Sequence, residues 1–242
     1  KDFDWNISLN LAHNENEVTR LSNDVFTMDK ILLGDVFIRG GSSSGTHVLE
    51  EGRPIGQFYG LVCNGIDENG RYIMVDKDGD GEISDPADYD YIGSAQPKLT
   101  YGITNTFRYK NFDLSFFLRG TIGNDILNAT RMAYAQSGFL PGTNALDDPL
   151  PYTLSETPRF SNYYLEKGSF MRLDNLTLGY KIKALNGIRV YFTAQNLFVI
   201  TKYKGLDPEV PMDSGDGLTP GVEPREFYPK ARTFSVGLNL NF

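Results

Sequence analysis

The stretch LTYGITNTFRYKNFDLSFFLRGTI, residues 99–122, decides the fold class, because apolar and polar side chains alternate along it. Before the dipeptide Lys110-Asn111 the apolar residues hold the odd positions, and after it they hold the even positions. Period-two alternation is typical of a β-strand with one apolar face. Two residues between two such runs predict a tight antiparallel hairpin.

Other parts of the chain alternate in the same way and extend the prediction to an all-β protein of about seven long strands. Three segments alternate clearly, residues 169–182, 188–195 and 234–242. Three others alternate more weakly, residues 3–12, 31–39 and 55–62. A change of phase near Asp174-Asn175 predicts a β-bulge. The tetrapeptide ALNG, residues 184–187, predicts a short turn between two of the clear strands.

The composition excludes several classes of protein. The chain has 31 Asp and Glu residues and 23 Lys and Arg residues, which gives a formal net charge of −8. This charge excludes a basic, nucleic-acid-binding protein. Hydrophobic residues make up 40% of the chain and aromatic residues 13%, which excludes a disordered polypeptide. With Cys63 as the single cysteine and His13 and His47 as the two histidines, an intrachain disulfide and a cysteine- or histidine-rich metal site are excluded.

The hydropathy pattern excludes a helical membrane protein and leaves a membrane β-barrel open. No apolar run approaches the roughly 18 residues that a membrane helix needs. A barrel strand is apolar on one face only, so mean hydropathy does not detect it. The first residues, KDFDWNISLN, contain neither an initiating Met nor a signal peptide, and we therefore expect a fragment or a processed piece.

The spacing of the strands favours a barrel over a soluble sandwich. Short turns alternate with three long irregular connections at residues 64–97, 123–161 and 204–228. Short turns at one end and long loops at the other are typical of outer-membrane barrels. An antiparallel sandwich with a shared apolar core is the alternative, but strands of ten or more residues exceed the usual sandwich strand of about five or six.

Five ordered motifs carry a resemblance to a known family. They are GRPIGQFYG at residues 52–60, VDKDGDGEIS at 75–84, IGSAQPKLTYGITNTFRYKNFDLSFFLRGTIGNDILN at 92–128, SFMRLDNLTLGY at 169–180 and AQNLFVITKYKGLDPEV at 194–210. The chain resembles the carboxy-terminal third of a SusC/RagA-type TonB-dependent transporter of the Bacteroidetes group. Its last residues, TFSVGLNLNF ending at Phe242, resemble the terminal strand of bacterial outer-membrane barrels.

The resemblance implies a 22-stranded antiparallel transmembrane barrel of the outer membrane, with residues 1–242 as its carboxy-terminal portion. It implies that a plug domain, the remaining strands and a TonB box lie outside this chain. It further implies a SusD-like surface lipoprotein as partner, import of glycans or oligopeptides, and no catalysis. Counting strands back from Phe242 places the three long connections outside the cell and residues 14–52 on the periplasmic side.

One motif has the spacing of a metal site. Asp76, Asp78 and Asp80 alternate before Gly81, as in the first half of a calcium loop, and the Glu82 carbonyl would be a further ligand. The twelfth position, which normally holds a bidentate Glu, is Ala87. Nearby Asp85 or Asp88 would have to replace it. The alternative is a solvated acidic turn without a metal.

Other candidate residues give weaker signals. Asp85, Glu156 and Asp147-Asp148 show no spacing that singles out a glycosidase pair. The glycine-rich residues 40–45 lack the Lys-Ser/Thr ending of a phosphate loop. Cys63 and His47 are expected to be structural, and Trp5 to lie at a membrane interface. A group of loop aromatics is expected to stack on sugars, to meet a lid protein or to pack together: Tyr134, Phe139, Tyr152, Phe160, Tyr163 and Tyr164.

Two functions therefore remain. The first is barrel wall and external loops of a TonB-dependent importer, and the second is a soluble all-β module that binds calcium or carbohydrate. The two differ in the surroundings of the apolar strand faces. A sandwich would bury these faces in a core, whereas a barrel segment would leave them exposed.

Overall fold

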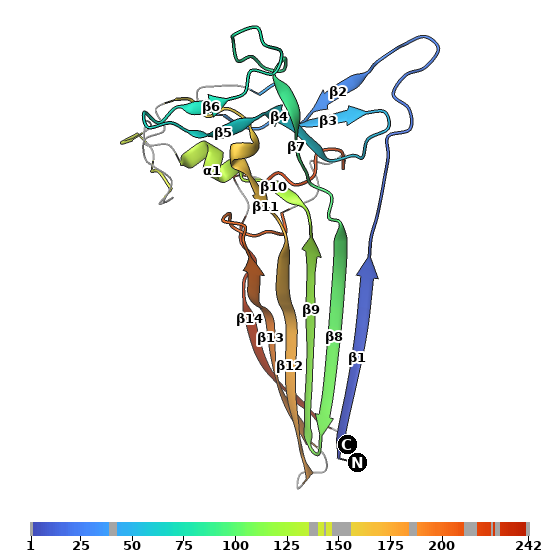
Figure 1. Ribbon diagram of the computed structural model, residues 1–242. Helices are drawn as coiled ribbons and strands as arrows, with labels where there is room; N and C mark the ends of the chain where they lie inside the picture. Colours follow the sequence, from blue (N-terminus) through green and yellow to red (C-terminus); the bar gives the residue numbers. More distant parts are fainter. Residues whose placement is uncertain are drawn as a thin grey trace.

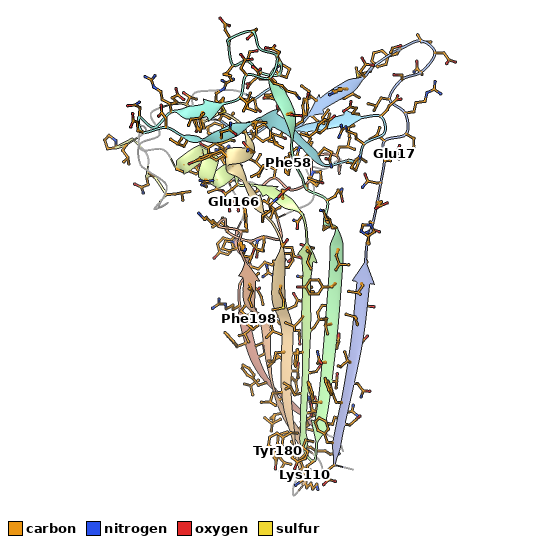
Figure 2. The ribbon with its side chains drawn as sticks, in the orientation of Figure 1. Glu17, Phe58, Lys110, Glu166, Tyr180 and Phe198 are labelled. Carbon is orange, nitrogen blue, oxygen red and sulfur yellow. The ribbon has the colours of Figure 1, made fainter. Side chains whose placement is uncertain are left out.

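The computed structural model describes residues 2–38, 43–135, 140–142, 144–146, 156–183, 188–210, 217–223, 225 and 228–240. These residues form a tall antiparallel sheet and a lobe of short elements at one end of it (Figure 1). Both chain termini lie at the other end of the sheet. Figure 2 shows Lys110 and Tyr180 at this far end, and Phe58 within the lobe.

Six strands form the tall sheet, here called the main sheet. In spatial order they are β1 (Phe3–Ala12), β8 (Leu99–Tyr109), β9 (Phe112–Ile122), β12 (Phe170–Ile182), β13 (Ile188–Thr201) and β14 (Thr233–Asn239). All neighbours are antiparallel. The all-β prediction is confirmed.

Two local predictions in the main sheet are also confirmed. Tyr109 pairs with Phe112, so Lys110-Asn111 forms the two-residue turn, and Lys110 takes the positive φ of 53° that such a turn requires. The register of β12 shifts between Leu173 and Asn175 against both of its neighbours, which is the bulge expected from the change of phase. The expected ALNG turn, residues 184–187, and Phe242 lie outside the described residues.

The register places most of the apolar side chains of the main sheet on one face, whereas Phe117 and Tyr191 lie on the other. Successive pairings join six residues into one row across the sheet, here called the apolar row: Trp5, Phe107, Leu114, Leu178, Phe192 and Val236. The residues directly beside them form a second row on the opposite face, here called the polar row: Asn6, Thr106, Ser115, Thr177, Thr193 and Ser235. Along these two rows the faces of the sheet therefore differ completely in polarity.

Among the described residues, no second sheet covers the apolar face. Trp5 is 53% exposed, Leu178 45% and Val236 76%. A soluble sandwich would bury such side chains in its core, so the structure does not support the soluble-module interpretation. In the described part of the chain, no helix has the length and apolar character that crossing a membrane requires.

In the described residues the lobe contains short strands, an α-helix and a 3₁₀ helix, which come from the segments that connect the strands of the main sheet. Its four-stranded sheet has the order β2 (Lys30–Leu33), β3 (His47–Glu50), β4 (Gln57–Leu61) and β7 (Tyr89–Ser94). The remaining elements are β5 (Cys63–Ile66), β6 (Tyr72–Met74), β10 (Asp125–Leu127), β11 (Leu165–Lys167), α1 (Ala129–Tyr134) and the 3₁₀ helix η2 (Asn162–Tyr164).

The lobe has its own hydrophobic core, to which two of the long connections contribute. Phe58, from residues 13–98 that join β1 to β8, and Met132 and Phe160, from the connection at residues 123–161, are fully buried in one cluster. The third connection is joined to them by backbone hydrogen bonds, in which Leu127 donates to Gly221 and Glu223 donates to Leu127. The connections therefore fold together rather than projecting as separate loops.

One sequence prediction about topology was wrong. Ala12 pairs with Thr100, and Phe3 with Tyr109, so residues 13–98 leave the main sheet at the same end as the other long connections. Residues 14–52 thus lie on the lobe side, not at the end of the short turns (Figure 1). Within the described residues the main sheet has six strands, close to the predicted number of about seven, and the alternating residues 31–39 and 55–62 supply only the short lobe strands β2 and β4.

Candidate functional site

The motif with calcium-loop spacing forms a compact turn, here called the acidic turn, residues 76–82. Carboxylate oxygens of Asp76, Asp78 and Asp80 lie within 4.8 Å of one another. The backbone amides of Gly79 and Gly81 donate to the two oxygens of Asp76 at 2.6 and 2.9 Å. Gly81 has φ of +89°, a conformation that L side chains rarely adopt, which explains a glycine at this position. Three carboxylates thus converge on one point.

The fourth candidate, Glu82, is not part of this group of carboxylates. Its backbone amide donates to Asp80 Oδ1 at 2.8 Å, and the residue is exposed. The two acids expected to replace the missing twelfth ligand are engaged elsewhere. Asp85 Oδ1 accepts from Arg159 at 2.6 Å, and Asp88 is buried beneath the turn. Within the described residues, the turn therefore offers three carboxylates rather than a complete calcium loop.

Asp88 holds the two ends of the acidic turn together. Its Oδ1 accepts from the Lys77 amide and its Oδ2 from the Ser84 amide, each at 2.7 Å. These backbone hydrogen bonds, with the one from Ser84 the strongest, lower the pKa of Asp88 below its ordinary value. A carboxyl group whose pKa is lowered on folding stabilises the folded turn above its unfolded pKa, and this contribution is lost as the pH falls through the folded value.

We therefore expect the acidic turn to keep its order from pH 8 to pH 5 and to loosen only below the ordinary Asp pKa of 3.8. Hydrogen exchange of the Lys77 and Ser84 amides, corrected for the intrinsic rate, measures this. Asp88→Asn is the control: it should loosen the turn already at neutral pH and show no further loss in acid. Loss of protection between pH 6 and pH 5 in the unchanged chain would contradict the assignment.

A second polar cluster lies on the polar face of the main sheet, near the lobe. Arg119 on β9 and Arg172 on β12 are direct register partners, and two like charges in that position repel each other. Acids from the third long connection neutralise them. Asp207 contacts Arg172 at 2.5 Å, and Glu209 contacts Arg119 through both carboxylate oxygens at 2.5 and 2.9 Å.

Two further charges complete this cluster, here called the arginine cluster. Asp174 accepts from Arg119 Nε at 3.0 Å, and Lys230 forms an ion pair with Glu209. Burial alone would raise the pKa of Glu209, but the hydrogen bonds from Arg119 and Lys230 outweigh burial and hold that pKa below its ordinary value. Three cations and three anions thus fix residues 207–209 against the polar face.

A cavity of about 490 Å³ lies beside the arginine cluster. Arg119 and Glu209 line it together with Asn10 and Thr100 from the polar face, and Phe117 adds an aromatic wall. Its lining combines hydrogen-bonding groups, one ion pair and apolar surface. Such a lining suits a polar solute that also offers apolar groups, as peptides and oligosaccharides do.

The remaining sequence candidates have structural surroundings. His47 is buried between Thr46 Oγ1 and the Pro220 carbonyl oxygen, each at 2.9 Å. Cys63 is buried with its thiol donating to the Gly65 carbonyl. Glu156 accepts from the Tyr72 amide. Neither Asp147-Asp148 nor glycines 40 and 41 are among the described residues.

The loop aromatics pack largely on one another where they are described. Phe160 and Tyr164 are buried in the lobe core, and Tyr163 packs against it with its ring 5.1 Å from that of Tyr164. Phe139 and Tyr152 lie outside the described residues. Trp5 stacks on Phe107 and donates to Asn105 at 3.2 Å, within the apolar face.

Sequence reasoning missed the arginine cluster. Arg172 lies in the phase change before the bulge, where alternation does not assign its face. The available signal was an arginine in the lobe-side part of each of two strands, followed by the acids of GLDPEV, residues 205–210. The pairing itself needed the fold, because Arg119 and Glu209 are 90 residues apart.

Comparison with known proteins gives a consistent result. No family model matches the chain. The TonB-dependent receptor SusC of Bacteroides thetaiotaomicron is 36% identical over the whole chain, which covers 25% of that protein. The TonB-dependent receptor P3 of Formosa agariphila is 30% identical, again over the whole chain, which covers 27% of it. The solved structure of the RagAB peptide transporter matches with a TM-score of 0.72 at 25% identity, covering 98% of this chain and 27% of that one.

A sheet with one largely apolar and one largely polar face, and with its long connections gathered at one end, defines a segment of an outer-membrane-type β-barrel. More particularly, the resemblance to SusC/RagA-type TonB-dependent transporters is confirmed by these relatives. The chain spans about a quarter of the length of the curated relatives it matches. The relatives named above are receptors or transporters and not enzymes, in agreement with the expectation of no catalysis.

Proposed function

We propose that the protein containing this chain is a TonB-dependent importer of glycans or oligopeptides in the bacterial outer membrane. Residues 1–242 supply carboxy-terminal barrel strands and the external lobe. The observation that carries the proposal is the pair of rows across the main sheet, one wholly apolar and one wholly polar. The apolar row faces lipid and the polar row faces the lumen.

Strand length supports this placement. Strands β8 and β9 have 11 residues each, which at about 3.3 Å per residue gives roughly 36 Å. Tilted by about 40°, such a strand crosses about 28 Å, close to the thickness of the hydrocarbon layer. Sandwich strands have no need of this length.

The edges of the main sheet imply further strands. β1 and β14 lie at its two edges. In lipid, each unpaired backbone group would cost several kcal/mol, so these edges must pair with strands from outside residues 1–242. The part of the transporter outside residues 1–242 would supply these strands, and it would also supply the plug domain and the segment that contacts TonB. A SusD-like lipoprotein would meet the lobe, which lies on the outer side of the membrane in this arrangement.

An uptake assay tests the proposed function. Cells that produce the whole transporter receive fluorescent oligopeptides in one experiment and fluorescent oligosaccharides in another. We expect accumulation of one of the two classes, and loss of accumulation when TonB or the lipoprotein is removed. Accumulation that continues unchanged without TonB would contradict the proposal.

We also propose that the acidic turn binds calcium and thereby stiffens the lobe. Oxygen donors suit this hard cation, and Asp76, Asp78 and Asp80 bring three carboxylates within 4.8 Å. The ion would offset the repulsion between these carboxylates and lock a turn in which Gly79 and Gly81 already have positive φ. The proposed role is structural, not catalytic.

Removal of one ligand should weaken this binding. We expect Asp80→Asn to weaken calcium binding to the whole transporter at least tenfold, because it removes one of three converging charges. Terbium luminescence with calcium competition measures it. Glu82→Gln is the matched control, because it keeps the backbone carbonyl and should bind as the unchanged protein does. Equal affinity in the Asp80→Asn variant would show that the turn is only a solvated acidic loop.

A further inference from the structure

A groove opens on the apolar face of the main sheet, directly below the lobe. It has a volume of about 490 Å³ and runs across the lobe-side ends of β8, β9, β12 and β13. Tyr101, Ile122 and Ile200 line it from the apolar face, as their pairings with Gly120, Leu99 and Met171 show. Thr121, Phe170 and Thr201 also line it, at strand-end positions whose register belongs to the polar face. We call this hollow the lysine groove, because Lys167 and Lys202 also line it.

Small residues explain why the sheet is hollowed here. Gly120 leaves room for the Tyr101 ring, whose hydroxyl donates to the Phe170 carbonyl at 3.3 Å. A Cβ at Gly120 would lie 2.0 Å from that carbonyl oxygen and 2.6 Å from the Tyr101 hydroxyl. Ser169 is also small and lines the groove. The hollow is thus built by the sequence of the strand ends.

The lining of the lysine groove is positively charged. Lys167 and Lys202 line it, and no acidic residue does so among the described residues. Lys167 is paired with Asp125 at 2.7 Å but keeps a side-chain exposure of 76%, so its ammonium remains open to a second partner. Lys202 forms no ion pair in the described part of the chain. The groove is therefore cationic in a chain whose net charge is −8.

Position and chemistry together define the occupant. In the proposed arrangement the groove lies where the outer end of the apolar face meets the headgroup layer. Its apolar walls, Ile122 and Ile200, lie toward the hydrocarbon, and its lysines lie toward the lobe. Ammonium groups bind phosphate strongly, whereas zwitterionic headgroups offer no net negative charge.

We propose that the lysine groove binds the phosphate-bearing headgroup of an outer-leaflet lipid, with an acyl chain along Ile122 and Ile200. This inference rests on the proposed membrane placement of the sheet. Bound lipid would fill the hollow beneath the lobe and would tie the lobe base, through Lys167, to the membrane surface.

Lipid titration followed by native mass spectrometry tests the proposal. The whole transporter is titrated in detergent with phosphatidic acid and, separately, with phosphatidylcholine. We expect preferential binding of phosphatidic acid, and about five- to 25-fold weaker binding in the variant Lys167→Gln/Lys202→Gln, because each ammonium near an anionic headgroup contributes about fivefold. The control Lys181→Gln/Lys183→Gln removes the same charge outside the groove and should bind as the unchanged protein does.

The outcomes separate this inference from the proposed function. Equal affinity of the groove variant and the unchanged transporter would overturn the lipid site, as would displacement of the lipid by inorganic phosphate at millimolar concentration, which would make free phosphate the ligand. A transporter that stays dissolved without detergent would instead overturn the membrane placement. Uptake of peptide or glycan by the groove variant is expected to match that of the unchanged transporter.

Discussion

Replacement of Arg172 by glutamine is expected to release residues 207–209 from the polar face at a cost of about 3–5 kcal/mol, because it leaves Asp207 buried without a counter-charge. Arg172 is 1% exposed and Asp207 4%. The Glu209 amide, which donates to Asp207 Oδ1 at 2.9 Å, reports the change. Its hydrogen exchange in the whole transporter should accelerate by roughly two to three orders of magnitude.

Two controls identify the cause of that effect. The double variant Arg172→Met/Asp207→Leu removes both charges and should recover most of the lost protection, because a buried pair replaced by apolar groups is often neutral. Arg119→Gln should cost less, because the Arg119 side chain is more exposed and Glu209 keeps Lys230. If the Glu209 amide exchanges at the same rate in Arg172→Gln and in the unchanged chain, the arginine cluster does not hold this segment.

Leu176→Arg is expected to destabilise the folded barrel by about 2–4 kcal/mol, the cost of an arginine on the lipid face near the midplane. Leu176 lies near the middle of β12 on the apolar face, paired with Phe116 and Ala194. Its neighbour Thr177 belongs to the polar row, so Thr177→Arg should cost less than about 1 kcal/mol. Urea unfolding of the whole transporter in lipid vesicles measures both. Equal losses, or a larger loss in Thr177→Arg, would show that the faces are assigned wrongly.

The main sheet was predictable because its determinants are local. Alternation assigns each side chain to a face, and a one-residue slip would exchange the faces, so the pattern also fixes the register. Lys110-Asn111 and the phase change at Asp174 are features of a few adjacent residues. For the same reason the sequence predicted the hairpin and the bulge at the positions where the structure has them.

The lobe was not predictable in this way. A short lobe strand such as β4 alternates as a membrane strand does, and counting it as a crossing placed residues 14–52 at the wrong end of the sheet. What distinguishes β4 is its length of five residues and the burial of Phe58 against Phe160, a contact between two different connections. Sequence periodicity carries no information about such contacts.

In the acidic turn, too, one feature was predictable from the sequence and another was not. The spacing of Asp76, Asp78 and Asp80 predicted their convergence, because alternate positions before a glycine turn share one side. The role of Asp88 was not predictable from the spacing of a calcium loop. It accepts hydrogen bonds from backbone amides at both ends of the turn and is therefore a structural support.

Site-specific fluorescence quenching tests the central claim, that the apolar row faces lipid and the polar row faces water. A fluorophore is attached to cysteines introduced singly at the adjacent positions Leu114 and Ser115 of the whole transporter in lipid vesicles. Native Cys63 contributes little background, because burial raises the pKa of its thiol. We predict that brominated lipid quenches the label at 114 and that aqueous iodide quenches the label at 115. Iodide quenching of both labels, with no effect of brominated lipid on either, would contradict the account.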